Sequence, residues 1–385
     1  MTTLITGSDG YVGSRLAARL LATTDDELLL TVRAADAAEL DAKRQRLGAY
    51  LGTADDDTRV SILPVDLGRE GAFDAVDPAR VRTIVHTAAI TRFNVEEDLA
   101  QRVNIDGAER VRDFALRAGQ LDRIVTTSTL YAAGRHEGAV GEAQLVDRTF
   151  VNFYEWSKWH AEQVLEQAGL PLTVARLPTV IAEDDTGVVV QQNAFHNTMR
   201  LYYYGLLTLL PGNPQTPLFL STVEFTVAAL QQLLDPEVPL GIYHIAADRD
   251  QTATFGEIVD TAFEVFERDP GFRRRRLPRP YVCDLESFRD MVAVAEQLKG
   301  GPINQAVGSV APFAEQLYLP KYFRNDALRA VWPEYRAPEP AKLIEAICSY
   351  LVETRWGRKA DTREQGAGLV GATREHRGST HDDVS

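Results

Sequence analysis

Short apolar runs alternate with amphipathic stretches through the first half of the chain. The runs are apolar on both faces, which is typical of strands buried within a parallel sheet. The stretches between them repeat their apolar residues at helical spacing. This alternation predicts a doubly wound α/β fold, with helices on both faces of a parallel sheet. The predicted strands are 3–6, 27–32, 60–65, 82–86, 123–127 and 172–177, and the predicted helices are 10–22, 37–52, 98–118 and 154–168.

The regular alternation ends after Pro178. The segment 183–218 mixes aromatic, amide and proline residues, whereas a helical stretch near 223–234 and a strand-like run at 241–246 predict a return to the first domain. Helical patterns then dominate until a final polar segment without apolar periodicity, which is typical of disorder. We therefore predict a first domain from 1–182 and 219–250, a smaller and mostly helical domain from 183–218 and 251–358, and a disordered tail at 359–385.

Composition narrows the classes of partner. The chain has 385 residues, of which 45% are hydrophobic and 25% charged, as in an ordinary folded protein. A net charge of −14 repels phosphate backbones and anionic membranes, so we expect small molecules or proteins as partners, and no nucleic acid. No apolar run reaches the length of a membrane span, and no basic leader precedes Leu4, so a cytoplasmic location is expected. Cys283 and Cys348 are predicted to be free thiols, and no metal site is predicted.

A glycine-rich segment follows the first predicted strand and opens the first helix. It reads Thr6-Gly7-Ser8-Asp9-Gly10-Tyr11-Val12-Gly13. Gly7 would allow a tight turn, Gly10 the approach of a pyrophosphate to the backbone, and Gly13 close packing of helix on strand. The amides and dipole of the helix would then face the phosphates. Residues 7–13 are thus assigned to a dinucleotide site in the first domain, with an ordinary glycine turn as the alternative.

Arg33 bears on which dinucleotide is bound. It lies twenty positions after Gly13, at the end of the second predicted strand, where NAD-preferring enzymes usually carry a carboxylate on the ribose 2′-hydroxyl. A guanidinium can instead hold a 2′-phosphate through two hydrogen bonds, so NADPH is predicted over NADH. A solvated arginine is the alternative, and Asp36 lies nearby. Asp66, which ends the third predicted strand, is assigned either to the adenine amino group or to a turn.

Tyr154 and Lys158 are four residues apart, one turn from each other on the same face of a predicted helix. A nearby cation favours the phenolate and is expected to bring the pKa of the phenol toward the working range. The pair therefore predicts proton transfer, with a buried tyrosine beside a surface lysine as the alternative. A hydroxyl cluster, Thr126-Thr127-Ser128-Thr129, ends the preceding strand, at the sheet edge that would face the cofactor.

Together these features resemble the extended short-chain dehydrogenase/reductases. Ser128-Thr129-Leu130-Tyr131-Ala132-Ala133-Gly134 and the run from Tyr154 to Glu162 are similar to the STxxxxG and YxxSKWxAE blocks of the branch that contains thioester reductases and fatty-acyl-CoA reductases. The similarity extends to about residue 350. Further matches to that branch are Val32-Arg33-Ala34, His86-Thr87-Ala88-Ala89, Asn104-Ile105-Asp106-Gly107 and Arg176-Leu177-Pro178-Thr179.

The resemblance implies roles for individual residues. Thr129 would donate a hydrogen bond to the substrate carbonyl, Tyr154 would be the general acid, and Lys158 would bind the nicotinamide ribose while lowering the pKa of the phenol. Asn104 would support a proton relay or the local backbone. Beyond the glycine loop and Arg33, the cofactor site would include Asp66, Leu67, Ala88, Ala89, Lys158, Pro178, Thr179 and Val180, and the substrate site would include Ser128, Tyr131, Phe195 and Met199.

The reaction implied by the resemblance is hydride transfer from NADPH to the carbonyl of an acyl thioester, giving an aldehyde and a thiol. The thioester would be carried by coenzyme A or by an acyl carrier protein, and a second hydride transfer to give an alcohol remains open. The aromatic segment 188–220, with Phe195 and Met199, is either the wall of an acyl site or simply core. The basic run Arg273 to Arg276 would meet an acidic carrier or coenzyme A phosphates, or is a solvated face.

Two other readings remain open. The same fold serves sugar-nucleotide epimerases and dehydratases and dehydrogenases of aldehydes, ketones or hydroxysteroids, although a basic Arg33 disfavours the tightly bound NAD of the epimerases. A non-enzymatic, dinucleotide-sensing scaffold is the third alternative, and an intact Thr129, Tyr154 and Lys158 disfavours it. The resemblance also implies pairing into homodimers through the helices near 98–118 and 154–168.

Overall fold

A seven-stranded parallel sheet forms the centre of the first domain in the computed structural model, which describes residues 1–53, 58–297 and 302–358. The strands lie in the order β11-β7-β5-β4-β1-β2-β3, as expected of a doubly wound fold. Every residue of β5 is buried, because helices cover both of its faces. The strands are β1 (Thr2–Thr6), β2 (Glu27–Val32), β3 (Val60–Pro64), β4 (Thr83–His86), β5 (Arg123–Thr129), β7 (Leu172–Leu177) and β11 (Ile242–His244).

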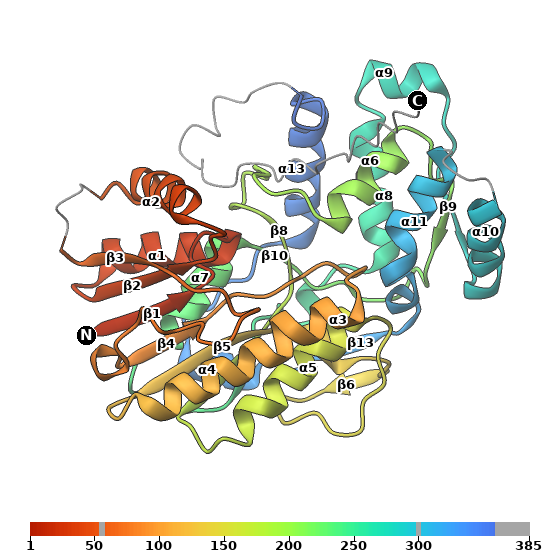
Figure 1. The fold of residues 1–385 in the computed structure, drawn as a ribbon. Coiled ribbons are helices and arrows are strands. Elements are labelled where there is room, and N and C mark those ends of the chain that lie inside the picture. Colours follow the sequence, from red (N-terminus) through yellow and green to blue (C-terminus); the bar gives the residue numbers. More distant parts are fainter. Residues whose placement is uncertain (54–57, 298–301, 359–385) are drawn as a thin grey trace, which may run out of the picture.

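Helices cover the two faces of this sheet (Figure 1). One face packs on α1 (Tyr11–Thr23), α2 (Ala37–Leu51) and α7 (Val223–Gln232), through an apolar cluster that includes the leucines of α1. The opposite face packs on α4 (Asp106–Arg117) and α5 (Phe153–Glu166), which lie side by side. The predicted fold class is therefore confirmed, and β11 joins the sheet beside β7 after the chain has returned from its excursion.

The single helix predicted at 98–118 is divided into three parts. It begins as α3 (Glu97–Ala100), widens into a π-helical turn at η2 (Gln101–Ile105) and continues as α4. A π turn inserts one extra residue per turn and re-aims the side chains that it carries. Asn104 lies within this turn, and its orientation is described with the site below.

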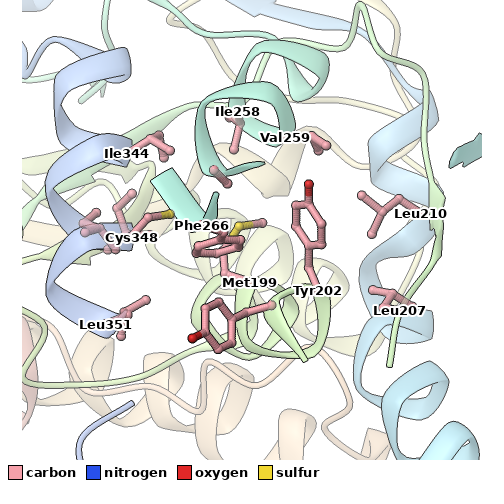
Figure 2. Packing of buried hydrophobic residues seen from close by; sticks show 14 of the residues in the cluster. Met199, Tyr202, Leu207, Leu210, Ile258, Val259, Phe266, Ile344, Cys348 and Leu351 are labelled. Atoms are coloured by element: carbon pink, nitrogen blue, oxygen red, sulfur yellow. The ribbon is translucent and has the colours of Figure 1, made fainter. Parts of the chain in front are cut away.

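A second, mostly helical body lies beyond the carboxyl ends of the strands. Its core joins Met199, Tyr202, Phe266, Ile344 and Cys348 (Figure 2). Both cysteines are buried free thiols, as predicted. Its elements are α6 (Ala194–Tyr203), α8 (Phe255–Phe266), α9 (Pro270–Arg275), α10 (Leu285–Gln297), α11 (Pro302–Ala314) and α13 (Pro340–Glu353), with β9 (Leu209–Pro211) paired to β12 (Tyr281–Cys283).

Short parallel pairs join the two bodies. They are β8 (Thr179–Ala182) with β10 (Leu220–Thr222), and β6 (Gly138–Val140) with β13 (Lys321–Phe323). After β13 the helix α12 (Asp326–Val331) returns to the first domain, where Leu328 and Tyr335 join the core beneath α7. This segment falls in the range that the sequence assigned to the second domain. Single 3-10 turns are η1 (Pro78–Arg80), η3 (Leu130–Ala133), η4 (Arg249–Gln251) and η5 (Glu315–Tyr318).

No helix in the described ranges is both long and apolar enough to cross a bilayer. The tail predicted at 359–385 lies outside the residues that the structure describes.

Candidate active site

The glycine loop joins β1 to α1 at the carboxyl edge of the sheet. Gly7 has a positive φ of 68°, and a Cβ there would lie 2.8 Å from Cα of Ala88. A Cβ on Gly13 would lie 2.3 Å from the carbonyl oxygen of Gly7, whereas Gly10 is exposed and more open. The two outer glycines thus hold the turn closed, and the middle glycine leaves the backbone accessible.

The amino end of α1 is open to an anion. Gly10 is its N-cap and supplies no side-chain hydrogen bond, and the first turn contains no acidic residue. The free amides and the helix dipole therefore favour a phosphate at this point. Ser8 is buried and accepts a hydrogen bond from the Thr31 amide at 3.1 Å, which ties the loop to β2. These features fit a dinucleotide pyrophosphate, and Tyr11 and Val12 follow on the half-buried first turn of the helix.

Two cations lie where β2 ends. The Arg33 side chain is exposed. The Lys43 ammonium on α2 lies 2.7 Å from a carboxylate oxygen of Asp9 and donates to the Arg33 carbonyl oxygen at 2.6 Å. No sequence motif pointed to Lys43, because its approach to the loop depends on how α2 packs. Asp66 accepts a hydrogen bond from the Gly68 amide at 2.9 Å, so it stabilises a turn, and Leu67 is buried beneath it.

The remaining predicted cofactor residues lie at the ends of neighbouring strands. Ala88 and Ala89 follow β4, and Ala88 packs directly against Gly7. Pro178 is buried after β7, and Thr179 and Val180 are half-buried at the start of β8. The fold therefore brings these segments to the same edge of the sheet as the glycine loop.

Tyr154, Thr129 and Lys158 come together between β5 and α5. The Thr129 hydroxyl lies near the Tyr154 phenol and acts to lower its pKa, and Thr129 also accepts a hydrogen bond from the Tyr131 amide at 3.2 Å. The Lys158 ammonium donates to the carbonyl oxygen of Thr127 at 2.7 Å. All three side chains are at most 9% exposed. The three groups that the sequence singled out thus share one buried site.

Burial dominates the ionisation of this site. It raises the pKa of Tyr154 to about 12, an effect that the Thr129 hydroxyl partly offsets. This direction is opposite to the one we expected from the neighbouring cation, because burial disfavours the phenolate and Lys158 is not among the groups that act on the pKa of Tyr154. Burial lowers the pKa of Lys158 to about 8, so its ammonium is largely protonated at neutral pH. A protonated phenol suits a general acid in the direction of reduction.

Asn104 contacts helix α5 next to Tyr154. Its amide nitrogen donates to Ser157 Oγ at 2.9 Å and to the Ile90 carbonyl oxygen at 3.0 Å, and its amide oxygen accepts from the Ile90 amide at 2.8 Å. Ser157 donates in turn to the Tyr154 carbonyl oxygen at 3.0 Å. The π turn η2 directs Asn104 inward to make these contacts. In this structure Asn104 therefore supports the backbone on either side of the site.

A pocket of about 40 Å³ opens beside Tyr131. Phe93 packs edge-on against both Tyr131 and Tyr154, with ring centroids 5.3 and 5.5 Å away, and it also contacts Phe313. Tyr131, which lines the pocket, and Tyr154 therefore pack on the same ring. The lining residues of the pocket are Leu130, Tyr131, Pro178, Thr179, Thr216, Pro217, Leu218, Phe219, Phe313, Gln316, Leu317, Leu319, Lys321 and Phe323.

The predicted substrate residues divide between this pocket and the core. Tyr131 lines the pocket, and Ser128 is buried on β5 with an Oγ that has no hydrogen-bond partner in the described part of the chain. Met199 instead lies in the core of the second body (Figure 2). Phe195 packs against that core. For Met199 the alternative given above, core rather than acyl wall, is what the structure shows. The part of segment 188–220 that reaches the pocket is its end, Thr216 to Phe219.

Several residues around the site were not predicted from the sequence. Phe93 follows β4 in an irregular segment, and Phe313, Gln316 and Lys321 come from 184 to 192 positions beyond Thr129, so their approach depends on the fold. Of these residues, Glu155 alone could have been found from the sequence. It is a charged residue directly after Tyr154 on a buried helix, and a buried charge needs a partner. It finds one in Gln316, at 2.9 Å.

The basic run Arg273 to Arg276 forms the end of α9. Arg275 lies over the rings of Tyr203 and Tyr204, with its guanidinium carbon 4.4 and 5.2 Å from their centroids. Arg273, Arg274 and Arg276 are exposed. One of the four arginines thus packs on aromatic residues and three face solvent.

The sheet, the glycine loop and the Thr129–Tyr154–Lys158 site together define an NAD(P)-dependent oxidoreductase of the extended short-chain dehydrogenase/reductase type. The chain belongs, more particularly, to the male sterility protein family of NAD-binding domains, which contains thioester reductases and whose model matches residues 5–230.

Comparisons with known proteins agree with this assignment. Isonitrile lipopeptide synthase from Streptomyces coeruleorubidus is 33% identical over 210 residues, which is 51% of this chain and 14% of the synthase. The chain therefore spans a small part of that relative's length. The terminal R domain of the myxalamid PKS-NRPS pathway superimposes with a TM-score of 0.72 at 18% identity, covering 94% of this chain and 92% of that domain.

Two further structures share the fold. A thiolation-reductase di-domain from an archaeal non-ribosomal peptide synthetase has a TM-score of 0.68 at 16% identity, covering 92% of this chain and 76% of the di-domain. UDP-glucuronic acid 4-epimerase from Bacillus cereus has a TM-score of 0.63 at 14% identity, covering 92% of this chain and 99% of the epimerase. At such identities the likeness concerns the fold alone.

Proposed function

We propose that this protein reduces an acyl thioester to an aldehyde with NADPH. The observation that carries the proposal is the buried Tyr154 phenol beside Thr129, with Phe93 packed between Tyr154 and Tyr131, which lines a mostly apolar pocket. Membership in a family that contains thioester reductases supports the choice of substrate.

NADPH, when bound, supplies a hydride. The amides at the start of α1 would hold its pyrophosphate, and Arg33, with Lys43 nearby, would hold its 2′-phosphate. Lys158, whose ammonium already donates to Thr127, would bind the ribose hydroxyls. The cations at the end of β2 support NADPH over NADH.

Thr129 and Tyr154 would act on the thioester carbonyl. Both hydroxyls would donate hydrogen bonds to its oxygen and stabilise the oxyanion that develops as the carbonyl carbon receives the hydride. Tyr154 would then transfer its proton to that oxygen, giving a hemithioacetal. Cleavage of the carbon–sulfur bond of the hemithioacetal releases aldehyde and thiol. In balance, thioester, NADPH and one proton give aldehyde, thiol and NADP⁺.

We further propose that the thioester is delivered on a carrier protein. The archaeal thiolation-reductase di-domain, whose fold is similar, combines a thiolation domain with a reductase domain, which supports a carrier protein as the partner. The exposed arginines Arg273, Arg274 and Arg276 offer an acidic carrier a cationic contact on a protein of net charge −14.

The test offers an acyl-coenzyme A, the matching aldehyde and a sugar nucleotide to the enzyme with NADPH or NADH. Cofactor oxidation and thiol release are measured together. We expect NADPH-dependent consumption of the thioester with one thiol released per thioester, and about 100- to 10,000-fold slower turnover in Tyr154→Phe.

Tyr281→Phe is the matched control, because the Tyr281 side chain is 72% exposed. NADPH binding by Tyr154→Phe, followed by fluorescence, verifies that the variant folds. Turnover of the aldehyde alone would assign a carbonyl reductase, and conversion of the sugar nucleotide would assign an epimerase or dehydratase. Either outcome would contradict the proposal.

A further inference from the structure

The pocket beside Tyr131 is apolar except at one end. Leucine, proline and phenylalanine side chains form most of its wall, whereas Gln316 and Lys321 bring an amide and an ammonium to it. Both residues are buried, and Lys321 is 6% exposed. A buried ammonium is costly unless it is paired or has a task, so its place in an apolar pocket requires an explanation.

A hydrogen-bonded chain fixes the orientation of this ammonium. The Gln316 amide nitrogen donates to both carboxylate oxygens of Glu155 at 2.9 Å, which leaves its amide oxygen turned toward Lys321. The Lys321 ammonium donates to that oxygen. Glu155 is held in turn by the Val151 amide at 3.0 Å. The ammonium is therefore held by the helix that carries the catalytic tyrosine.

The Lys321 ammonium has more N–H groups than hydrogen-bond acceptors. An ammonium carries three N–H groups, and within the described ranges Gln316 is the one hydrogen-bond acceptor of Lys321 Nζ. Glu155 and Glu137 both attract the charge, but Gln316 stands between Lys321 and Glu155, and neither carboxylate forms an ion pair with Lys321 within the described ranges. Burial lowers the pKa of Lys321 to about 8, so the group is still largely charged at neutral pH. Two N–H groups thus remain for a ligand.

The position of the pocket makes that ligand part of the substrate. Tyr131 and Phe313 line the pocket, and both contact Phe93, which packs on Tyr154. Thr179, from the segment assigned to the cofactor, lines it as well. A volume of about 40 Å³ holds a few heavy atoms, since one water needs roughly 10–15 Å³.

We propose that Lys321 selects acyl groups that carry a hydrogen-bond-accepting oxygen a few atoms from the thioester, such as a carbonyl or a carboxylate. The inference rests on the proposed thioester reductase function and deepens it by naming the substrate class. A plain alkyl chain would leave the buried N–H groups unpaired, and this penalty is the basis of discrimination. Lys321 acts on specificity and takes no part in hydride or proton transfer.

The experiment compares three coenzyme A thioesters of similar length: pentanoyl, 4-oxopentanoyl and glutaryl. Thiol release is followed with NADPH, because it is independent of any reduction of the 4-oxo group. For the wild-type protein we expect kcat/KM to be about 10- to 100-fold higher for at least one oxygen-bearing thioester than for pentanoyl. The 4-oxo and carboxylate arms distinguish a neutral from an anionic acceptor.

Lys321→Met should reduce this ratio to near one. Lys342→Met is the matched control, because the Lys342 side chain is 78% exposed on α13, and it should leave the ratio as in the wild type. The wild-type ratio tests the inference even if Lys321→Met fails to fold.

Equal efficiency with all three thioesters would overturn the inference and leave the proposed function intact. Preference unchanged in a folded Lys321→Met would also overturn it. No thioester consumption at all would overturn the proposed function, and the inference with it.

Discussion

The glycine loop and the pocket beside Tyr131 are built in different ways. The loop is one continuous segment, residues 6–13, that joins a strand to a helix. The pocket takes its walls from η3, from Thr216 to Phe219, and from Phe313 to Phe323. Local sequence therefore specifies the loop, whereas the pocket exists only once the second body has folded against the first.

This difference teaches where specificity resides. The loop and the Thr129–Tyr154–Lys158 site supply chemistry that many substrates could share. The pocket, which includes the buried Lys321, is where substrates would be told apart. Substitutions in the two regions should therefore have separable effects on cofactor and on thioester.

Gly13→Ala should have the largest effect. Its Cβ would lie 2.3 Å from the Gly7 carbonyl oxygen, so the loop must open and the amides at the start of α1 must move. We expect NADPH affinity to fall by more than about 100-fold, measured by fluorescence titration. Gly119→Ala is the matched control, since no atom lies within 4 Å of the Cβ that it adds. Unchanged NADPH binding in Gly13→Ala would contradict the loop assignment.

Arg33→Glu should reverse the preference between cofactors. Losing a charge-assisted pair with the 2′-phosphate and adding a repulsive carboxylate should lower kcat/KM for NADPH by about 10- to 100-fold, with little change for NADH. Arg46→Glu, on an exposed position of α2, makes the same change in net charge and serves as control. A parallel loss with both cofactors would argue for a structural role of Arg33.

Phe219→Ala should affect the other region. Its ring lines the pocket and packs edge-on against Phe323 at 5.1 Å. Removing it should raise KM for pentanoyl-coenzyme A about tenfold through lost apolar contact, with the dissociation constant of NADPH unchanged. Leu240→Ala, at a residue 50% exposed, is the control. An equal loss of NADPH affinity would break the separation between the two regions.

A pH profile should give the smallest effect and report on the shared chemistry. The pKa of Lys158 is lowered to about 8 and that of Tyr154 is raised to about 12. As the pH rises, the lysine therefore loses its proton well before the phenol does. We expect kcat/KM for pentanoyl-coenzyme A to be about half its neutral value near pH 8. A constant value up to pH 10 would show that the charge of Lys158 is not needed.

The architecture of the first domain could be predicted from the sequence because periodicity is a local property. The strands and helices of the sheet follow from apolar runs and amphipathic stretches, and the glycine loop follows from its place between them. The π turn at η2 could not be predicted, because the contacts of Asn104 with Ile90 and Ser157 that accompany it join separate elements. The return of α12 to the first domain also depends on packing between distant segments.

The three candidate catalytic residues could be predicted from the sequence for the same reason. Tyr154 and Lys158 are neighbours by helical spacing, and Thr129 ends a strand whose edge the fold class defines. The ionisation of these residues could not be predicted from the sequence, because the pKa of Tyr154 depends on how deeply tertiary packing buries the phenol. Met199 shows the same limit: its helical spacing is equally compatible with a substrate wall and with the core where it lies.

The sequence by itself determined the fold class, the cofactor loop and the three groups on which the proposed chemistry rests. These depend on residues that are close in the chain or that a regular sheet brings to one edge. Only the tertiary structure decided which side chains line the pocket that we propose for the substrate. The Lys321 ammonium is held by Gln316, which in turn is held by Glu155. These two residues lie five and 166 positions from Lys321 in the chain, so no local sequence pattern predicts the contacts.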